Sequence, residues 1–315
     1  MSREIIAIVG PTASGKSSLA VGIAKKIGGE IISADSRQIY RGLDIGTGKI
    51  TKKEMRAIPH HLLDIRNPRE QYSAGEFKQD AEKKIEEIAR RGNIPIVVGG
   101  TGFWIDSLLL GLRLPDVPPD PRLRARLSRK NASELFRMLL KLDSVRARTI
   151  DPENPHRLVR AIEIARTLGR VPPIKKTPRY RVLWIGINLP MHALKMNIGK
   201  RAMRMVARGL IAETKSLAAK RVSKKRLRTL GFEYALSLNL LEGRLEKEKI
   251  VSALAARDSR YAKKQLAWFK KNLNIHWIKT KNEAFRLVRK SFVKYAAART
   301  STELGRSPAA LDTER

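Results

Sequence analysis

Residues 10–17 read Gly-Pro-Thr-Ala-Ser-Gly-Lys-Ser and match G-x-x-x-x-G-K-[ST] at every fixed position. The β-branched run at residues 5–9 predicts a buried strand before this stretch, and residues 17–27 predict a helix after it. A strand, a glycine-rich loop and a helix in this order turn backbone N–H groups toward a polyphosphate. The sequence therefore predicts a phosphate-binding loop. The alternative is a glycine-rich turn whose lysine is merely solvated.

Two side chains of this loop have expected roles. Lys16 would reach a terminal phosphate, and the Ser17 hydroxyl would ligate Mg²⁺. The motif predicts that a phosphate chain binds, but it does not say what happens to that chain. The residues expected to hold the chain are Gly10, Pro11, Thr12, Ala13, Ser14, Gly15, Lys16 and Ser17.

The composition excludes several classes of protein. The chain has 315 residues and no cysteine, which excludes disulfides, thiolate zinc sites and cysteine nucleophiles. No apolar run approaches the ~20 residues of a membrane span, and the first predicted strand leaves no room for a signal peptide. We expect a monomeric cytoplasmic protein without a membrane partner.

The net charge of +35 is unevenly distributed. Residues 1–115 hold 18 Lys and Arg against 13 Asp and Glu, residues 116–181 hold 17 against 7, and residues 182–300 hold 28 against 7. An excess of positive charge creates an electrostatic field that attracts polyanions, so the charge favours nucleic acid as the partner. The alternative is a host whose proteins are generally basic.

Strands and helices alternate along the first third of the chain, which is typical of a parallel sheet with sites at the carboxyl ends of its strands. Four prolines in residues 114–121 interrupt this pattern, and basic helical segments follow until a second proline cluster at 172–178. We expect a P-loop NTPase-like α/β fold, a parallel sheet flanked by helices with a helical insertion domain. The expected parts are the first part of the core at 1–115, the insertion at 116–180, the largely helical and basic core completion at 181–299, and a flexible tail at 300–315.

Further elements follow from the same patterns. Ser73 and Glu76 form a capping box before a helix that reaches residue 91. Strands are expected at 30–34, 94–98, 182–189 and 276–278, and helices of the insertion at 122–129, 133–142 and 155–168.

Asp35 is the acidic residue that follows a predicted strand near the loop. The strand at 94–98 ends without an acid, and the guanine-reading motif Asn-Lys-x-Asp is absent, which disfavours a motor or switch NTPase. The Asp35 carboxylate can hold Mg²⁺ or accept a proton from a nucleophile in front of the phosphates. It can equally be a helix N-cap.

Two other segments have alternative interpretations. His60 and His61 are neighbours whose side chains point apart, so packing or hydrogen bonding is favoured over a metal pair. Residues 260–271 alternate basic residues with aromatic ones. This composition suits contacts between the basic side chains and phosphates, and stacking of nucleobases on the aromatic rings. In the alternative, the helix packs Tyr261, Trp268 and Phe269 into a core and leaves its lysines solvated. We expect both to hold in part.

Seven blocks of this sequence carry a resemblance to one family, and they lie at residues 10–17, 33–47, 59–65, 98–101, 154–163, 230–232 and 260–265. In this order and along nearly the whole chain they resemble the tRNA dimethylallyltransferases, also called tRNA isopentenyltransferases. Trp104 and Phe232 stand where the family commonly has tyrosine, and Ala267 where it usually has threonine.

The resemblance implies a reaction. Asp35 would be the general base toward the N6 amine of the tRNA adenosine just 3′ of the anticodon. This amine would attack C1 of dimethylallyl diphosphate, expel pyrophosphate and form N6-isopentenyladenosine. Lys16, Mg²⁺ on Ser17, Thr101 and Arg201 would stabilise the leaving group, and Asp35, Thr101 and Arg201 are the expected catalytic residues.

The flipped adenosine must be held by compensating contacts. By the resemblance, the residues that line the tRNA side are Asp35, Ser36, Arg37, Gln38, Thr101, Arg124, His156, Arg157, Leu158, Val159, Arg160, Leu227, Gly231, Phe232, Lys263, Lys264, Gln265, Trp268 and Lys270.

The residues alone also suggest two other functions. A P-loop kinase of a small metabolite would explain the loop and Asp35, but not the charge or the basic insertion. A non-catalytic RNA-binding module would leave the loop and Asp35 unexplained.

Overall fold

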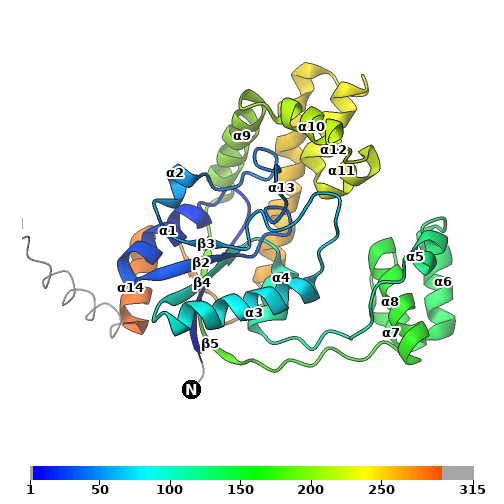
Figure 1. The fold of residues 1–315 in the computed structure, drawn as a ribbon, viewed down its shortest axis with the longest axis horizontal. Helices are drawn as coiled ribbons and strands as arrows, with labels where there is room; N and C mark the ends of the chain where they lie inside the picture. Colours follow the sequence, from blue (N-terminus) through cyan, green and yellow to red (C-terminus); the bar gives the residue numbers. More distant parts are fainter. Residues whose placement is uncertain (1–2, 293–315) are drawn as a thin grey trace, which may run out of the picture. The chain divides into compact units, whose positions relative to one another are not determined.

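A parallel six-stranded sheet forms the core of the larger of two compact units, in a computed structural model that describes residues 3–292 (Figure 1). The strand order is β3-β2-β4-β1-β5-β6, and each neighbouring pair is parallel. This confirms the predicted fold class. The strands are β1 (Arg3–Val9), β2 (Gly29–Ser33), β3 (His60–His61), β4 (Ile94–Gly99), β5 (Tyr180–Ile187) and β6 (His276–Ile278).

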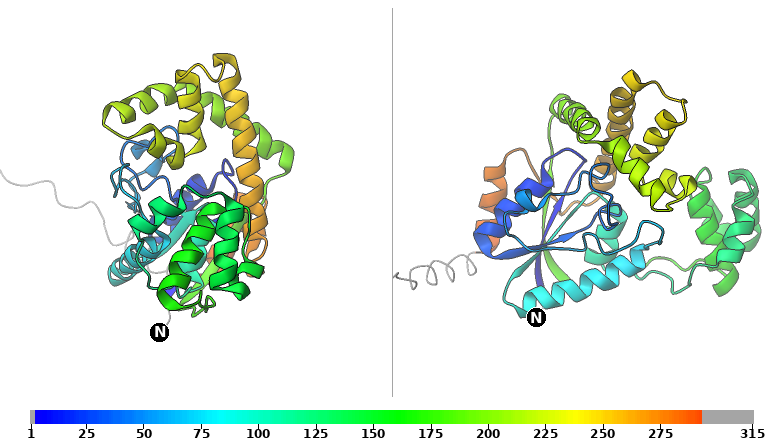
Figure 2. Two further views of the ribbon diagram at one scale, coloured as in Figure 1. Left: turned by 90° about the vertical axis from the view of Figure 1, so that its right-hand side faces the viewer. Right: turned by 45° about the horizontal axis from the view of Figure 1, so that its top comes forward.

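Helices cover both faces of the sheet, which is why the adjacent strands β1 and β4 are mostly apolar and buried. Ile5, Ala7 and Val9 of β1 pack in the same cluster as α3 (Ala74–Arg90) and α4 (Gly102–Leu109). Ile6 and Ile8 point the other way and pack with α1 (Lys16–Ile27) and α14 (Lys281–Ser291). Figures 1 and 2 show α3 and α1 on opposite sides of the sheet.

The chain after β5 is mostly helical, as predicted. The predicted capping box of α3 is present, because Ser73 accepts from the Glu76 N–H and Glu76 accepts from the Ser73 N–H. No helix within residues 3–292 is long and apolar enough to cross a membrane. The remaining helices outside residues 111–178 are α2 (Lys52–Met55), α9 (Met191–Ala207), α10 (Leu210–Ala219), α11 (Lys224–Leu230), α12 (Phe232–Leu241), the 3₁₀ helix η1 (Lys247–Lys249) and α13 (Ile250–Phe269).

Gly111–Pro178 forms a second compact unit with a core of its own. It begins and ends earlier than the expected 116–180, because its two connecting segments pair with each other: the Arg113 N–H donates to the Lys175 carbonyl at 3.0 Å. Its short helix α7 was not predicted. The expected tail at 300–315 lies outside the described residues. The helices of the second unit are α5 (Pro121–Leu127), α6 (Ala132–Leu142), α7 (Ser144–Thr149) and α8 (Pro155–Leu168).

Candidate active site

A cavity of about 1070 Å³ opens at the carboxyl ends of the strands in the larger unit. The glycine-rich loop follows β1, Asp35 follows β2, and Gly99 and Gly100 lie at the end of β4. Because parallel strands end at one edge of the sheet, these segments meet there. Lys16, Asp35 and Arg201 all line this one cavity.

The loop before α1 has the turned backbone that a phosphate site needs. Ala13 and Gly15 have φ of 59° and 89°, in the left-handed region. The Lys16 ammonium donates to the Pro11 carbonyl at 2.6 Å, so the side chain folds back over the loop. Burial lowers the pKa of Lys16 to about 8, the nearby Asp35 opposes this shift, and Arg201 adds to it. An incoming phosphate would restore the ordinary stability of the ammonium.

Gln265 of α13 holds this loop against the end of β4. Its Oε1 accepts the Thr12 N–H at 2.7 Å, and its Nε2 donates to the Gly100 carbonyl at 2.9 Å. A Cβ on Gly100 would lie 2.1 Å from this Nε2, so only glycine permits the approach. Gln265 is 6% exposed, and both ends of its amide are occupied. It therefore supports the loop.

Asp35 and Thr101 lie on adjacent strand ends that hydrogen-bond to each other. The Thr101 hydroxyl oxygen accepts the Ser36 N–H at 3.1 Å, and Asp35 Oδ1 accepts the Arg37 N–H at 2.9 Å. A turn follows Asp35, with no helix, so the N-cap alternative does not apply. Asp35 lines the cavity, whereas Thr101 is not among the lining residues and is bonded to the turn that follows Asp35.

Arg201 reaches the cavity from α9. Its Nη2 donates to the Thr47 carbonyl at 3.0 Å, and its Nε lies 3.7 Å from Asp258 Oδ2 of α13. A Cβ on Gly48 would lie 2.7 Å from the guanidinium, and the φ of Gly48 is 59°, so this glycine leaves room for the arginine. Arg201 is thus held on two sides by parts of the chain far apart in sequence.

A second, partly buried arginine lies at the same end of the sheet. Arg37 donates from Nη1 to both carboxylate oxygens of Glu233, at 2.8 and 3.2 Å, and its guanidinium lies 5.2 Å from the Phe232 ring centre and 5.5 Å from that of Tyr261. Burial raises the pKa of Glu233 to about 7, against the effect of Arg37. A Cβ on Gly231 would lie 2.6 Å from Glu233 Oε2. Arg37 is therefore fixed by the fold.

The residues expected on the tRNA side divide into exposed and buried groups. Leu158 and Leu227 are fully buried, so their side chains pack the cores beneath the surface. Trp268 is half-buried and donates to Asp106 at 2.8 Å, and Phe269 is in the core. The packing interpretation of residues 260–271 therefore holds for Phe269 and in part for Trp268, whereas Tyr261 lines the cavity. Phosphate contacts and base stacking by this segment stay a prediction. The exposed members are His156, Arg157, Lys263, Lys264 and Lys270.

In the second unit, buried Glu163 organises two of the expected arginines. Arg124 donates from Nε and Nη2 to its carboxylate at 2.7 and 2.8 Å, and Arg160 donates at 3.2 Å. Burial would raise the pKa of Glu163, but these arginines and the Asp120 N–H lower it. Arg124 and Arg160 therefore have a structural role besides any contact with RNA.

The two histidines hydrogen-bond separately, as the sequence favoured. His60 Nδ1 contacts the Ile58 carbonyl at 2.8 Å, and His61 Nε2 contacts Glu30 Oε2 at 2.7 Å. In the described part of the chain, no group of three or more His, Asp or Glu side chains is arranged to hold a metal ion.

Sequence reasoning missed several residues of the site. Asn197, Lys200 and Arg204 line the cavity from the same helix as Arg201. Asn197 and Arg204 lie at the helical spacings of four and three residues from Arg201, and Lys200 is its neighbour in sequence. Glu233 and Asp258 were also missed. They are two of only seven acidic residues among 182–300, and an acid that stands alone in so basic a region was the available signal.

Comparison with known proteins identifies the family. A family model described as IPP transferase matches residues 38–272. The chain belongs to the IPP transferase family. A tRNA dimethylallyltransferase from Thermomicrobium roseum is 41% identical over 87% of this chain and 86% of its own.

Two solved structures of the IPP transferase family support the same assignment. A full-length tRNA isopentenylpyrophosphate transferase from Bacillus halodurans matches with a TM-score of 0.70 and 33% identity, over 96% of this chain and 99% of that one. A eukaryotic dimethylallyltransferase, captured acting on tRNA, matches with a TM-score of 0.77 and 25% identity, over 98% and 81% of the two chains.

Gln265→Ala should weaken binding of inorganic pyrophosphate by about tenfold. The change leaves the Thr12 N–H and the Gly100 carbonyl without their partner, and each buried unpaired group costs about 1–3 kcal/mol, part of which loosens the loop. The measurement is a calorimetric titration of the folded protein with pyrophosphate and Mg²⁺. Ser252→Ala, on the exposed side of the same helix, is the matched control. Equal affinity in both variants would mean that the loop holds its shape without Gln265.

Proposed function

We propose that this protein transfers the dimethylallyl group of dimethylallyl diphosphate to the N6 amine of the tRNA adenosine adjacent to the anticodon on its 3′ side. The products are N6-isopentenyladenosine in tRNA and pyrophosphate. One observation carries the proposal. A single cavity is lined by a phosphate-binding loop, by a carboxylate at a neighbouring strand end and by an arginine from a third segment.

The reaction needs a proton acceptor for the amine and positive charge for the leaving pyrophosphate, and the two must lie close together. The N6 nitrogen attacks C1 of the donor, the C1–O bond breaks, and its electron pair leaves with pyrophosphate. The amine proton passes to Asp35, whose Oδ1 is oriented by the Arg37 N–H. Lys16 and Arg201 line the same cavity and would stabilise the charge that develops on the leaving group.

Unpartnered polar atoms in the cavity wall fit an anionic ligand. Ser14 Oγ in the loop and Arg201 Nε are both buried without a hydrogen-bond partner within residues 3–292. Such groups are costly unless a ligand or water satisfies them. A diphosphate has enough acceptor oxygens to pair with the Arg201 N–H and with the Ser14 hydroxyl.

The start of α1 also fits Mg²⁺. The exposed Ser17 contributes a hard oxygen ligand to the cavity wall. Mg²⁺ commonly takes one or two protein oxygens and fills its remaining positions with water and substrate phosphates. When bound, the ion would neutralise part of the diphosphate charge.

The product of the reaction tests this function. We expect isopentenyladenosine in the nucleosides of unmodified tRNA after incubation with the protein, dimethylallyl diphosphate and Mg²⁺, as measured by mass spectrometry. Omission of the donor or addition of a chelator should abolish the product. Turnover of ATP without any isopentenyladenosine would contradict the proposal and favour a kinase.

The exposed basic side chains of the second unit would contact the phosphates of the anticodon stem-loop. Arg157 and His156 are exposed at the start of α8, where neither is tied to an acidic side chain in the way that Arg160 is tied to Glu163. The unit's excess of bases over acids supports this role. On the larger unit, the exposed lysines of α13 would make similar contacts.

Arg157→Ala should weaken tRNA binding and reduce its salt dependence. Each lost phosphate contact lowers the slope of log K against log salt by roughly 0.7–0.9. The measurement is a tRNA titration at several salt concentrations. Arg170→Ala removes an equally exposed charge beyond the other end of α8 and is the matched control. An unchanged slope for Arg157→Ala, or the same loss in both variants, would remove Arg157 from the tRNA interface.

A further inference from the structure

We propose that Glu213 is a positioning residue for Arg201, and that it acts through the loop at residues 43–49. The proposal rests on the function given above, in which Arg201 stabilises the leaving pyrophosphate. Glu213 lies in the first turn of α10, a helix that is not among those lining the cavity.

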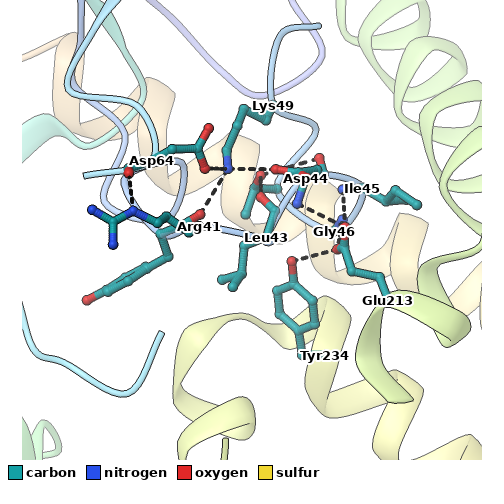
Figure 3. A network of polar contacts seen from close by, with 11 residues as sticks. Arg41, Leu43, Asp44, Ile45, Gly46, Lys49, Asp64, Glu213 and Tyr234 are labelled. Carbon is teal, nitrogen blue, oxygen red and sulfur yellow. Dashed lines mark hydrogen bonds and ion pairs between the residues drawn. The ribbon is translucent and has the colours of Figure 1, made fainter. Parts of the chain in front are cut away.

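The Glu213 carboxylate binds a run of consecutive backbone N–H groups (Figure 3). Its Oε2 accepts from Asp44 at 2.9 Å and from Ile45 at 2.7 Å, and its Oε1 accepts from Gly46 at 2.9 Å. Hydrogen bonds to a charged acceptor are stronger than neutral ones. The carboxylate therefore fixes the direction of three successive peptide units.

A buried tyrosine orients the carboxylate from its other side. The Tyr234 hydroxyl donates to Glu213 Oε1 at 2.9 Å, and Tyr234 is fully buried. Burial, with a further contribution from Glu213, raises the pKa of Tyr234, so this hydroxyl stays a donor at neutral pH. Tyr234 of α12 thus orients the Glu213 carboxylate, and this carboxylate in turn binds the loop.

The other end of the loop is anchored by a buried lysine. Lys49 Nζ contacts Asp44 Oδ1 at 2.7 Å, Asp64 Oδ1 at 2.5 Å and the Tyr40 carbonyl at 2.9 Å (Figure 3). Only 5% of its side chain is exposed. With both ends fixed by ionic groups, the backbone between them has little freedom to move.

This fixed backbone is the part of the chain that holds Arg201. Thr47 is next to Gly46, and its carbonyl accepts the Arg201 Nη2–H, while the guanidinium lies over Gly48. A displacement of the Gly46 peptide would therefore move the acceptor of Arg201. Misplacement of a catalytic group by about 1 Å can cost about 10²-fold in rate.

The test is a double-mutant cycle between Glu213 and Arg201, read as single-turnover formation of isopentenyladenosine. Glu213→Gln keeps the size of the side chain but turns an N–H₂ group toward the loop's N–H donors. We expect about a tenfold loss of rate in the wild-type background. In the Arg201→Ala background, the same substitution should have almost no effect, because there is no guanidinium left to position.

The controls separate this proposal from a general loss of stability and from failure of the proposed function. Glu246→Gln removes an exposed charge and should leave the rate unchanged. If Glu213→Gln does not fold, Tyr234→Phe removes one donor to the carboxylate and should show the same dependence on Arg201 with a smaller effect. Equal losses in both backgrounds would overturn the proposal. Absence of product with the wild-type protein would instead refute the proposed function.

Discussion

The site depends on the two hydrogen bonds of the Gln265 amide. They join α13, near the end of the described chain, to the Thr12 N–H of the phosphate loop and to the Gly100 carbonyl after β4. The same helix brings Asp258 to Arg201 and Tyr261 to Arg37. One helix thus contacts the phosphate loop and both of these arginines, which line the cavity.

Paired charges explain how so basic a protein builds an ordered site. Buried Glu233 and Asp258 lie against Arg37 and Arg201, and Glu213 fixes the backbone that contacts Arg201. Because an unpaired buried charge is costly, these acids set where the arginines can be. Lys16 differs, since its hydrogen bond is to the Pro11 carbonyl, and its ammonium can turn to a phosphate.

The sequence predicted most of the sheet and the outline of the site. β-Branched runs and a glycine-rich loop are local signals, so β1, β2, β4 and β5 were found, with Lys16 and Asp35 at their ends. β3 was missed because two residues carry no periodicity, and its pairing with β2 is set by the fold. The second unit begins at Gly111 because its connecting segments pair across about 60 residues, which no local pattern reveals.

The missed site residues act over long sequence separations. Gln265 matched the family pattern, but only the structure places its amide on the loop. The resemblance also put Leu158 and Leu227 on the tRNA side, where burial assigns them to packing. Glu213 and Glu233 are linked to residues 167 and 196 positions away, and only their scarcity in a basic region hinted at a role.

The single-turnover rate of Asp35→Asn tests the central claim most directly. Asparagine can keep the hydrogen bond from the Arg37 N–H, so the turn after β2 is preserved while the proton acceptor is lost. We predict a fall of about 10²–10⁴ in the rate of isopentenyladenosine formation at saturating tRNA and donor, with tRNA affinity within a few-fold of the wild type. A rate close to that of the wild type would contradict the account, because the proton would then leave by another route.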